Sequence, residues 1–257
     1  MSRLSLLATI AINLRRLIVI LGILLAGPAL ALVSGAVSLE RSWHTASRES
    51  AGLMPPAAAT PEAVVQVYGA RTFGWRGAFA VHTWIAAKPA GADSYTTYEV
   101  IGWRAWRDGN ALVRREGPPD RHWFGAKPEI YAELRGSEAA AAIPEIEAAI
   151  AAYPYTTQYR TWPGPNSNTF TASIARQVPA LRLDLPPTAV GKDYLAADRF
   201  FAEAPSGTGY QVSLLGALGL LAAREEGLEI NLLGMTFGID PGDLAVKVPG
   251  LGRLGAR

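Results

Sequence analysis

Residues 162–177 read WPGPNSNTFTASIARQ, and in this stretch a loop rich in proline and glycine is followed by a helix pattern. Asn and Ser are preferred residues at helix starts, so the pattern predicts a helix from Asn168 to Gln177 that ends before Pro179. The triplet Asn166-Ser167-Asn168 then stands at the start of this helix, and the segments on both sides of it have the character of strands.

The segments before this helix are rich in β-branched and aromatic residues and are separated by turn formers, which is typical of strands. We predict strands at residues 78–87, 95–103, 111–115 and 130–135. Residues 61–68 fit either a short helix or a strand. Residues 137–153 carry apolar side chains at helical spacing, with Ser137 as the expected cap and Pro144 as a break or a second start.

Strands return after the central helix. Residues 210–218, 228–237 and 244–248 are predicted to form a closing meander. The apolar run 212–223 also fits a helix, but Gly216 and Gly219 oppose that alternative, and the run is too short to cross a membrane. The order of strands, helix, loop, helix and strands predicts an α+β domain.

An uncharged run of 23 residues, from Leu17 to Leu39, follows Arg15 and Arg16. This run is long enough to cross the ~30 Å hydrocarbon layer of a bilayer, so it predicts a single-pass anchor. Cations on its N-terminal side keep that side in the cytoplasm, which places the chain in the inner membrane with its main domain in the periplasm or outside. Two alternatives stay open: a signal peptide cleaved at Ala29-Leu30-Ala31, and a buried core helix.

Residues 1–39 are therefore expected to form a cytoplasmic tail and anchor, residues 40–61 an Ala- and Pro-rich spacer, and residues 62–257 one domain.

The chain contains no cysteine, which excludes disulfides, thiolate metal sites and thiol nucleophiles. Its net charge of +2 gives no sign of nucleic-acid binding. The histidines lack the spacing of metal ligands, so we expect neither a metal nor a cofactor; the oligomeric state is left open.

Two residues stand out as candidates for chemistry. His82 lies in an apolar strand, where a hydrogen-bonded core histidine is the simpler interpretation. Ser167 lies at a helix start, where backbone N–H groups stabilise developing negative charge, although Asn166 or Ser167 would also serve there as a plain cap. A serine nucleophile needs a general base, and His82 is the candidate that lies in a strand.

A family resemblance supports this pairing. Asn166-Ser-Asn-Thr-Phe170 resembles the Asn-Cys-Asn-x-Phe motif of the PPPDE (desumoylating-type) cysteine peptidases, with serine in place of cysteine. His82-Thr83, followed by Tyr98-Glu-Val-Ile-Gly102, is similar to the His-Thr pair and the later acidic strand of those proteins. The order of histidine before nucleophile is that of the circularly permuted papain-like fold, shared with permuted NlpC-type hydrolases and lecithin:retinol acyltransferase relatives. The exported region also resembles a bacterial membrane-anchored domain-of-unknown-function family, through His-Thr-Trp-Ile, Gly-Pro-Asn-Ser-Asn-Thr-Phe and Asn-Leu-Leu-Gly.

The resemblance implies a permuted papain-like domain with an antiparallel sheet, in which Ser167 is the nucleophile and His82 the base. The implied supporting residues are Glu99 or Tyr98 to orient the imidazole, Asn166 and the Ser167 N–H as oxyanion contacts, and Asn168 and Trp162 as lining. A serine, unlike a thiolate, depends on proton transfer to a well-oriented histidine. The implied activity is hydrolysis or acyl transfer at an amide or ester bond of a peptide, glycan or lipid. The alternatives are a non-catalytic envelope binding module that keeps the papain-like cleft, and two motifs that are purely structural.

Overall fold

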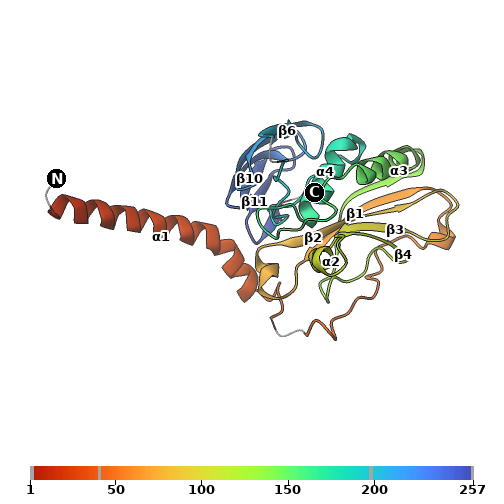
Figure 1. Cartoon of the computed structure of the whole chain (residues 1–257), viewed down its shortest axis with the longest axis horizontal. Helices are drawn as coiled ribbons and strands as arrows, with labels where there is room; N and C mark the ends of the chain where they lie inside the picture. Colours follow the sequence, from red (N-terminus) through yellow and green to blue (C-terminus); the bar gives the residue numbers. More distant parts are fainter. Residues whose placement is uncertain (1–2, 40–41, 197–198, 256–257) are drawn as a thin grey trace.

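The computed structural model describes residues 3–39, 42–196 and 199–255, and it consists of a long N-terminal helix and an α+β body (Figure 1). The helices are α1 (Arg3–Val33), α2 (Gly102–Arg107), α3 (Gly136–Ala151) and α4 (Ser167–Gln177), with 3-10 turns η1 (Ala57–Ala59), η2 (Gly74–Ala78) and η3 (Pro179–Leu181). The strands before α4 are β1 (Val64–Arg71), β2 (Val81–Lys88), β3 (Thr96–Val100), β4 (Leu112–Glu116) and β5 (Glu129–Arg135). The strands after it are β6 (Phe201–Glu203), β7 (Gly209–Leu214), β8 (Leu218–Ala223), β9 (Gly227–Leu232), β10 (Met235–Asp240), β11 (Ala245–Val248) and β12 (Gly252–Leu254).

The first sheet has five strands in the order β4-β3-β2-β1-β5, and its neighbouring strands all pair antiparallel. Strand β2 is buried along its whole length, and β1 along all of it but Arg71, because layers cover both faces of the sheet. Their sequences, VVQVYGAR and VHTWIAAK, suit that position, since β-branched and aromatic side chains pack well on a pleated surface. The segment 61–68, which fitted a helix or a strand, is therefore mostly strand.

The second sheet has seven strands in simple sequence order, β6 to β12, and is an antiparallel meander. The closing meander expected from the sequence is present with different bounds: the strand expected at 210–218 ends at Leu214, and residues 228–237 belong to two strands, β9 and β10, joined by a turn. The apolar run 212–223 forms β7 and β8, not a helix. Together with the first sheet and the helices, this meander makes the body α+β, as predicted.

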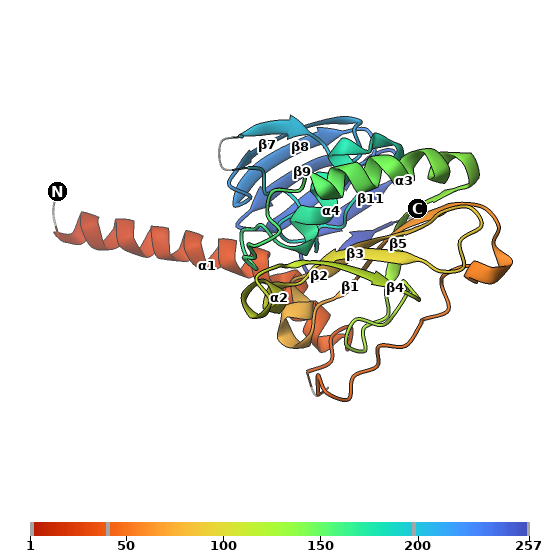
Figure 2. The ribbon, with the colours of Figure 1, turned by 45° about the vertical axis from the view of Figure 1, so that its right-hand side comes forward.

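Helices α3 and α4 lie between the two sheets (Figure 2). Side chains from one face of the five-stranded sheet, including Val65, Ile85 and Tyr98, pack on Ile146 of α3 and Phe170 of α4 in the main core. The other face of that sheet has its own cluster, built around Tyr68, Trp84 and Trp123. Helix α3 begins one residue before Ser137 and has no side-chain cap, and Pro144 lies inside it without ending it.

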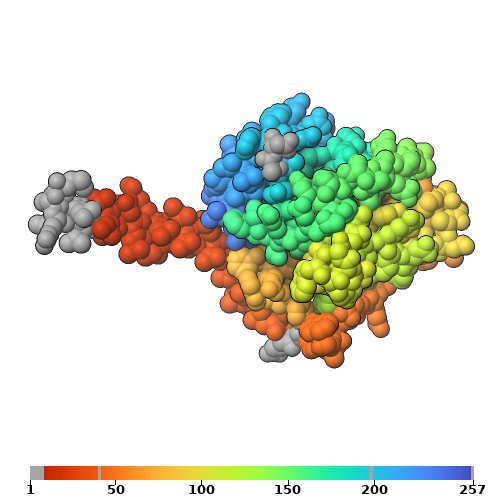
Figure 3. Space-filling model, viewed as in Figure 1, coloured from red at the N-terminus to blue at the C-terminus, as the bar shows by residue number. Residues whose placement is uncertain are grey.

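Helix α1 projects from the body, as Figure 3 shows, and Thr9–Val33 is apolar and long enough to cross a membrane. Its bounds differ from the expected 17–39: the helix starts earlier, contains Arg15 and Arg16, and ends at Val33. The part of α1 nearest the body packs against it, and Leu24 and Ala31 are buried there. The absence of charge marks residues 17–39 but does not mark where the helix ends. The helix ends at Val33 because the glycine and serines that follow it form turns.

The segment expected to be a spacer lies against the body. Asp120 accepts hydrogen bonds from the N–H groups of Leu53 and Met54, at 2.6 and 3.2 Å, and from the Ser50 hydroxyl at 2.9 Å. Leu53, Met54 and Ala57 pack on the cluster around Trp84. A single buried carboxylate thus fixes a segment that composition alone describes as extended and free.

Candidate functional site

The start of α4 is organised by Asn166, which is its N-cap. The Asn166 Oδ1 accepts from the N–H groups of Asn168 and Thr169, at 2.9 and 3.1 Å, and Thr169 completes a capping box with the Asn166 N–H. The Asn166 Nδ2 donates to the carbonyls of Thr161 and Val190, both at 3.0 Å. The Asn166 amide is therefore engaged in capping and in bridging two loops, and Asn166 also lines the pocket described below.

Ser167 is the first residue of α4 and is 3% exposed. The phenol of Tyr159 lines the same pocket as Ser167. Burial raises the pKa of that phenol, and its interaction with Ser167 offsets only part of the effect, so Tyr159 is neutral and no base near pH 7.

A pocket of about 210 Å³ lies over Ser167. Its wall is mainly apolar and aromatic, with Trp75, Phe79 and Trp162 among its members, and Leu233 and Met235 close it from the turn between β9 and β10. Trp162 lines the pocket as predicted from its place beside the triplet, and its Nε1 donates to the Leu233 carbonyl at 2.9 Å. Asn168 lines the pocket too, and its Nδ2 donates to the carbonyls of Val81 and Val190 at 3.1 and 2.8 Å.

Strand alternation separates His82 from this pocket. Thr83 is the β2 residue that meets α4: its hydroxyl lies 3.2 Å from the Ser167 carbonyl and 3.0 Å from Asn168 Oδ1. Successive side chains of a strand point to opposite faces of the sheet, so His82 points away from α4. The structure thus does not bring the His82 imidazole and the Ser167 hydroxyl together, because the two lie on opposite sides of β2.

His82 belongs instead to a buried charge network on the far face. Its Nε2 lies 2.9 Å from Glu99 Oε2, and the other oxygen of Glu99 pairs with Arg121. The imidazole stacks on Trp123, with ring centroids 3.7 Å apart, and is 3% exposed. Burial lowers the pKa of His82 despite the hydrogen bond to Glu99. Burial alone would raise the pKa of Glu99, but the His82 hydrogen bond and the Arg121 charge outweigh it and lower that pKa to about 2.

Of the two residues expected to orient the imidazole, the structure selects Glu99. Tyr98 pairs with Ile85 across β2 and β3 and faces the helices, where its hydroxyl donates to Glu147 at 3.0 Å. Tyr98 shares a face with Ile85, whereas Glu99 reaches the His82 side of the sheet.

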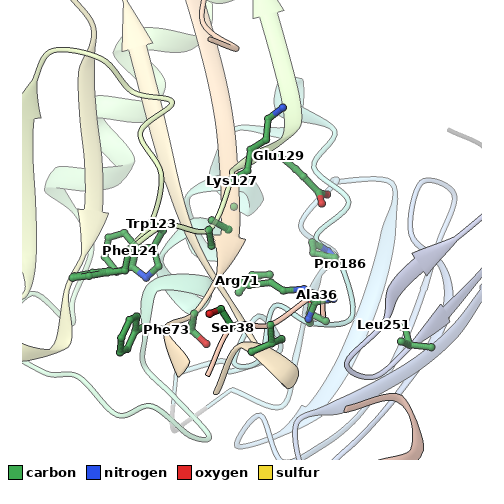
Figure 4. Close-up of a pocket in the computed structure, with 18 of the residues that line it drawn as sticks. Ala36, Ser38, Arg71, Phe73, Trp123, Phe124, Lys127, Glu129, Pro186 and Leu251 are labelled. Atoms are coloured by element: carbon green, nitrogen blue, oxygen red, sulfur yellow. The ribbon is translucent and has the colours of Figure 1, made fainter. Parts of the chain in front are cut away.

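A second and larger pocket, of about 710 Å³, lies between residues 35–38, the end of β1 and the C-terminal segment (Figure 4). Trp123 and Phe124 lie on one side of it and Leu251 on the other (Figure 4). Arg71 lies in this pocket but donates to the carbonyls of Gly77 and Gly250, at 2.7 and 3.0 Å, so it joins β1 to the turn between β11 and β12. His82 does not line either pocket. Within the described ranges, no group of three His, Asp or Glu side chains is arranged to hold a metal ion.

Two residues near the candidate side chains are not indicated by any sequence pattern: Arg121, which pairs with Glu99, and Tyr159, which lines the pocket with Ser167. Arg121 follows Pro118-Pro119 in a loop, and Tyr159 lies in another loop between α3 and α4. No periodic pattern marks either residue, since both act through contacts with distant parts of the chain.

The fold and site define an α+β domain joined to an N-terminal helix that is long and apolar enough to span a membrane. In this domain Ser167 is the first residue of a helix, and the buried His82 lies elsewhere. The chain belongs to the DUF3750 family, described as a protein of unknown function, whose family model matches residues 62–194. No curated protein and no solved structure matches it. The expected membership of a domain-of-unknown-function family is thus confirmed. The matched region contains every predicted site residue and ends before the seven-stranded sheet.

Proposed function

We propose that this chain is a membrane-anchored, non-catalytic binding module whose ligand enters the pocket over Ser167. One observation carries the proposal: among the described residues that line this pocket, none is a histidine, aspartate or glutamate. Ser167 therefore has no general base beside it, and serine nucleophiles depend on one. The Asn166 amide, one of the donors expected for an oxyanion, is also engaged, since it bridges two loops.

The lining favours one chemical class of ligand, an apolar chain with a polar end, as in a lipid. Trp75, Trp162 and Leu233 are each about half exposed or more and form an apolar rim. Polar side chains in the lining are Thr72, Arg76, Tyr159, Thr161, Asn166, Ser167 and Asn168, and the amides of Asn166 and Asn168 are engaged in hydrogen bonds to backbone carbonyls. A volume of about 210 Å³ accommodates part of one chain or one ring, and is small for a folded peptide or a glycan.

We also propose the finer assignments of fold and topology. A permuted papain-like core is supported by an antiparallel sheet packed on a helix that begins at Ser167, with His82 earlier in the chain. A cytoplasmic N-terminus with an exported body in the inner membrane is supported by Arg15 and Arg16 on the N-terminal side of the apolar run. Protease added to intact spheroplasts should digest the body and spare an N-terminal fragment. Digestion of the N-terminus alone would show the opposite topology, with the body in the cytoplasm.

The test of the binding function uses the full-length chain in detergent and two probes. A photoreactive fatty-acid analogue should crosslink to the wild-type chain at the pocket lining. Thr161→Trp, which narrows an exposed part of the rim, should reduce crosslinking several-fold, whereas Thr157→Trp, an exposed loop position outside the lining, should leave it unchanged. Equal crosslinking of both variants would refute the pocket as the ligand site.

The second probe is a fluorophosphonate, which modifies activated serines. We expect no labelling of wild-type protein above the level of Ser167→Ala. Labelling that the Ser167→Ala change abolishes would overturn the non-catalytic assignment and favour a hydrolase or acyltransferase that acts through Ser167.

A further inference from the structure

The seven-stranded sheet is built with its apolar side outward. Cross-strand pairing places Val212, Leu220, Ile230 and Phe237 in one row across the outer face. The strand residues of this face are otherwise Phe201, Glu203, Tyr210, Leu214, Leu218, Ala222, Leu228, Leu232, Met235, Ile239, Val246, Val248 and Leu254. Glu203 is the one charged side chain among these described positions, and most of the large apolar ones are exposed. An apolar face of this extent marks an interaction surface.

The inner face of the same sheet is polar. Glu229 and Lys247 are buried there and pair at 2.7 Å, and Lys192, from the segment after α4, pairs with Glu229 at 2.5 Å. Asn231 donates to Asp193 at 2.8 Å. This arrangement is the reverse of an ordinary half-buried sheet, in which the apolar side chains face the body and the polar ones face water.

The two ends of the sheet also differ in polarity. At one end the turns have the sequences LLGAL (residues 214–218), LLGM (232–235) and VPGLG (248–252). At the other end the segments are EAPSGTG (203–209), AREEG (223–227) and DPGDLA (240–245). The apolar turns expose leucine at their tips: Leu215 is 46% exposed and Leu233 is 55% exposed, both with left-handed backbone. Turn positions of this kind usually carry Gly, Asn or Asp.

Helix α1 contacts the apolar end. The turn between β11 and β12 packs so closely on α1 that a Cβ on Gly27 would overlap the Pro249 carbonyl oxygen and lie 3.4 Å from Val248 Cγ1. Val248 belongs to the outer face, so that face is continuous with α1. In Figures 1 and 3 the blue seven-stranded sheet lies at the upper left of the body, on the side toward which α1 projects.

The position of this contact along α1 sets its depth in a membrane. Gly27 lies eleven residues after Arg16, which is about 16 Å along a helix. With Arg16 at the inner boundary of a ~30 Å hydrocarbon layer, Gly27 lies near the middle of that layer. The turn that packs on Gly27 then lies within the outer half of the bilayer, where only an apolar surface is tolerated.

We propose that the apolar end of the seven-stranded sheet, with the adjoining part of its outer face, is inserted in the leaflet into which α1 emerges. The occupant of the face is the bilayer itself. The polar turns at the other end stay in water, and hydrogen bonds between neighbouring strands pair the backbone groups that lie between them. This inference rests on α1 crossing the bilayer; Leu233 also lines the Ser167 pocket, so Leu215, which does not line it, is the test position that is independent of what the pocket binds.

The chain has no cysteine, so single cysteines report on chosen positions without a background. Leu215→Cys and Leu233→Cys, each labelled with the fluorophore NBD, test the apolar end in the full-length chain reconstituted into phosphatidylcholine vesicles. Leu244→Cys is a matched control, because Leu244 is also an exposed leucine with left-handed backbone but lies in a turn at the polar end. Melting temperatures equal to that of the unlabelled chain establish that each variant is folded, and the two test sites serve as replicates of each other.

We expect NBD at positions 215 and 233 to emit at shorter wavelength than at 244, to lose most of its emission with nitroxide-labelled lipid, and to resist iodide. NBD at 244 should show the reverse. Iodide quenching at 215 and 233 equal to that at 244 would overturn the proposal. Protection at 215 and 233 from both quenchers would overturn it too, and would assign the face to a second copy of the chain.

Discussion

His82 Nε2 lies 2.9 Å from Glu99 Oε2, with both side chains buried on the face of the five-stranded sheet that turns away from Ser167. This pair makes the histidine part of the core. The bond also joins β2 to the end of β3 and, through Arg121, to the loop that carries Trp123. The same network explains how the protein should respond to mutation and to acid.

Glu99→Gln is expected to lower the free energy of unfolding by about 3–5 kcal/mol, because it leaves the Arg121 guanidinium without its buried counter-charge. Glu116→Gln, at an exposed position of β4, should change it by less than about 0.5 kcal/mol. Urea unfolding of the full chain in detergent, followed by tryptophan fluorescence, measures both. Equal values for the two variants would show that the network contributes little.

Acid should destabilise the protein in two stages. The pKa of His82 is lowered in the folded state, so the unfolded chain takes up the proton first and stability falls as the pH drops below about 6.5. The pKa of Glu99 is lowered from 4.5 to about 2, so a further loss follows across that range. His82→Gln should flatten the slope of stability against pH between 7 and 5, whereas His122→Gln, outside the network, should keep it.

Asn166→Ala should destabilise the protein by about 2 kcal/mol or more, because it removes the α4 cap and also leaves the Thr161 and Val190 carbonyls without the Asn166 donor. Asn166→Asp separates the two roles, since it keeps the capping oxygen and loses the donor. We expect the Asp variant to be destabilised as well. Wild-type stability of Asn166→Asp in thermal unfolding would mean that capping is the whole contribution.

Lys247→Met should destabilise the packing of the seven-stranded sheet on the body by about 3–5 kcal/mol. The Lys247 ammonium lies 2.5 Å from Asp184 Oδ1 and 2.7 Å from Glu229 Oε1, and without it Asp184 is left as a poorly compensated carboxylate. Adding Asp184→Asn to Lys247→Met should recover part of the loss. A strictly additive double variant, measured in the same urea titration, would contradict the coupling.

Much of the fold could be predicted from local pattern. The meander after α4, the strands of the first sheet and the helix beginning at the Asn-Ser-Asn triplet follow from residue type and spacing, and Asn166 is a cap of the preferred kind. The bounds of α1 were less accurate, because the absence of charge does not mark where a helix ends. Two residues near the candidate side chains, Arg121 and Tyr159, gave no local signal at all.

Local residue patterns predicted most of the strands, the apolar helix long enough for a membrane and the residues at the start of α4, but they left residues 61–68 open between helix and strand and did not indicate α2. Alternation along a strand defines two faces, yet it does not say which face meets a helix and which meets another layer. Tertiary structure alone decided that Thr83, and not His82, meets α4, and that the C-terminal sheet turns its charges inward and its leucines outward. The physical reason is that both outcomes depend on which distant segments pack on each face.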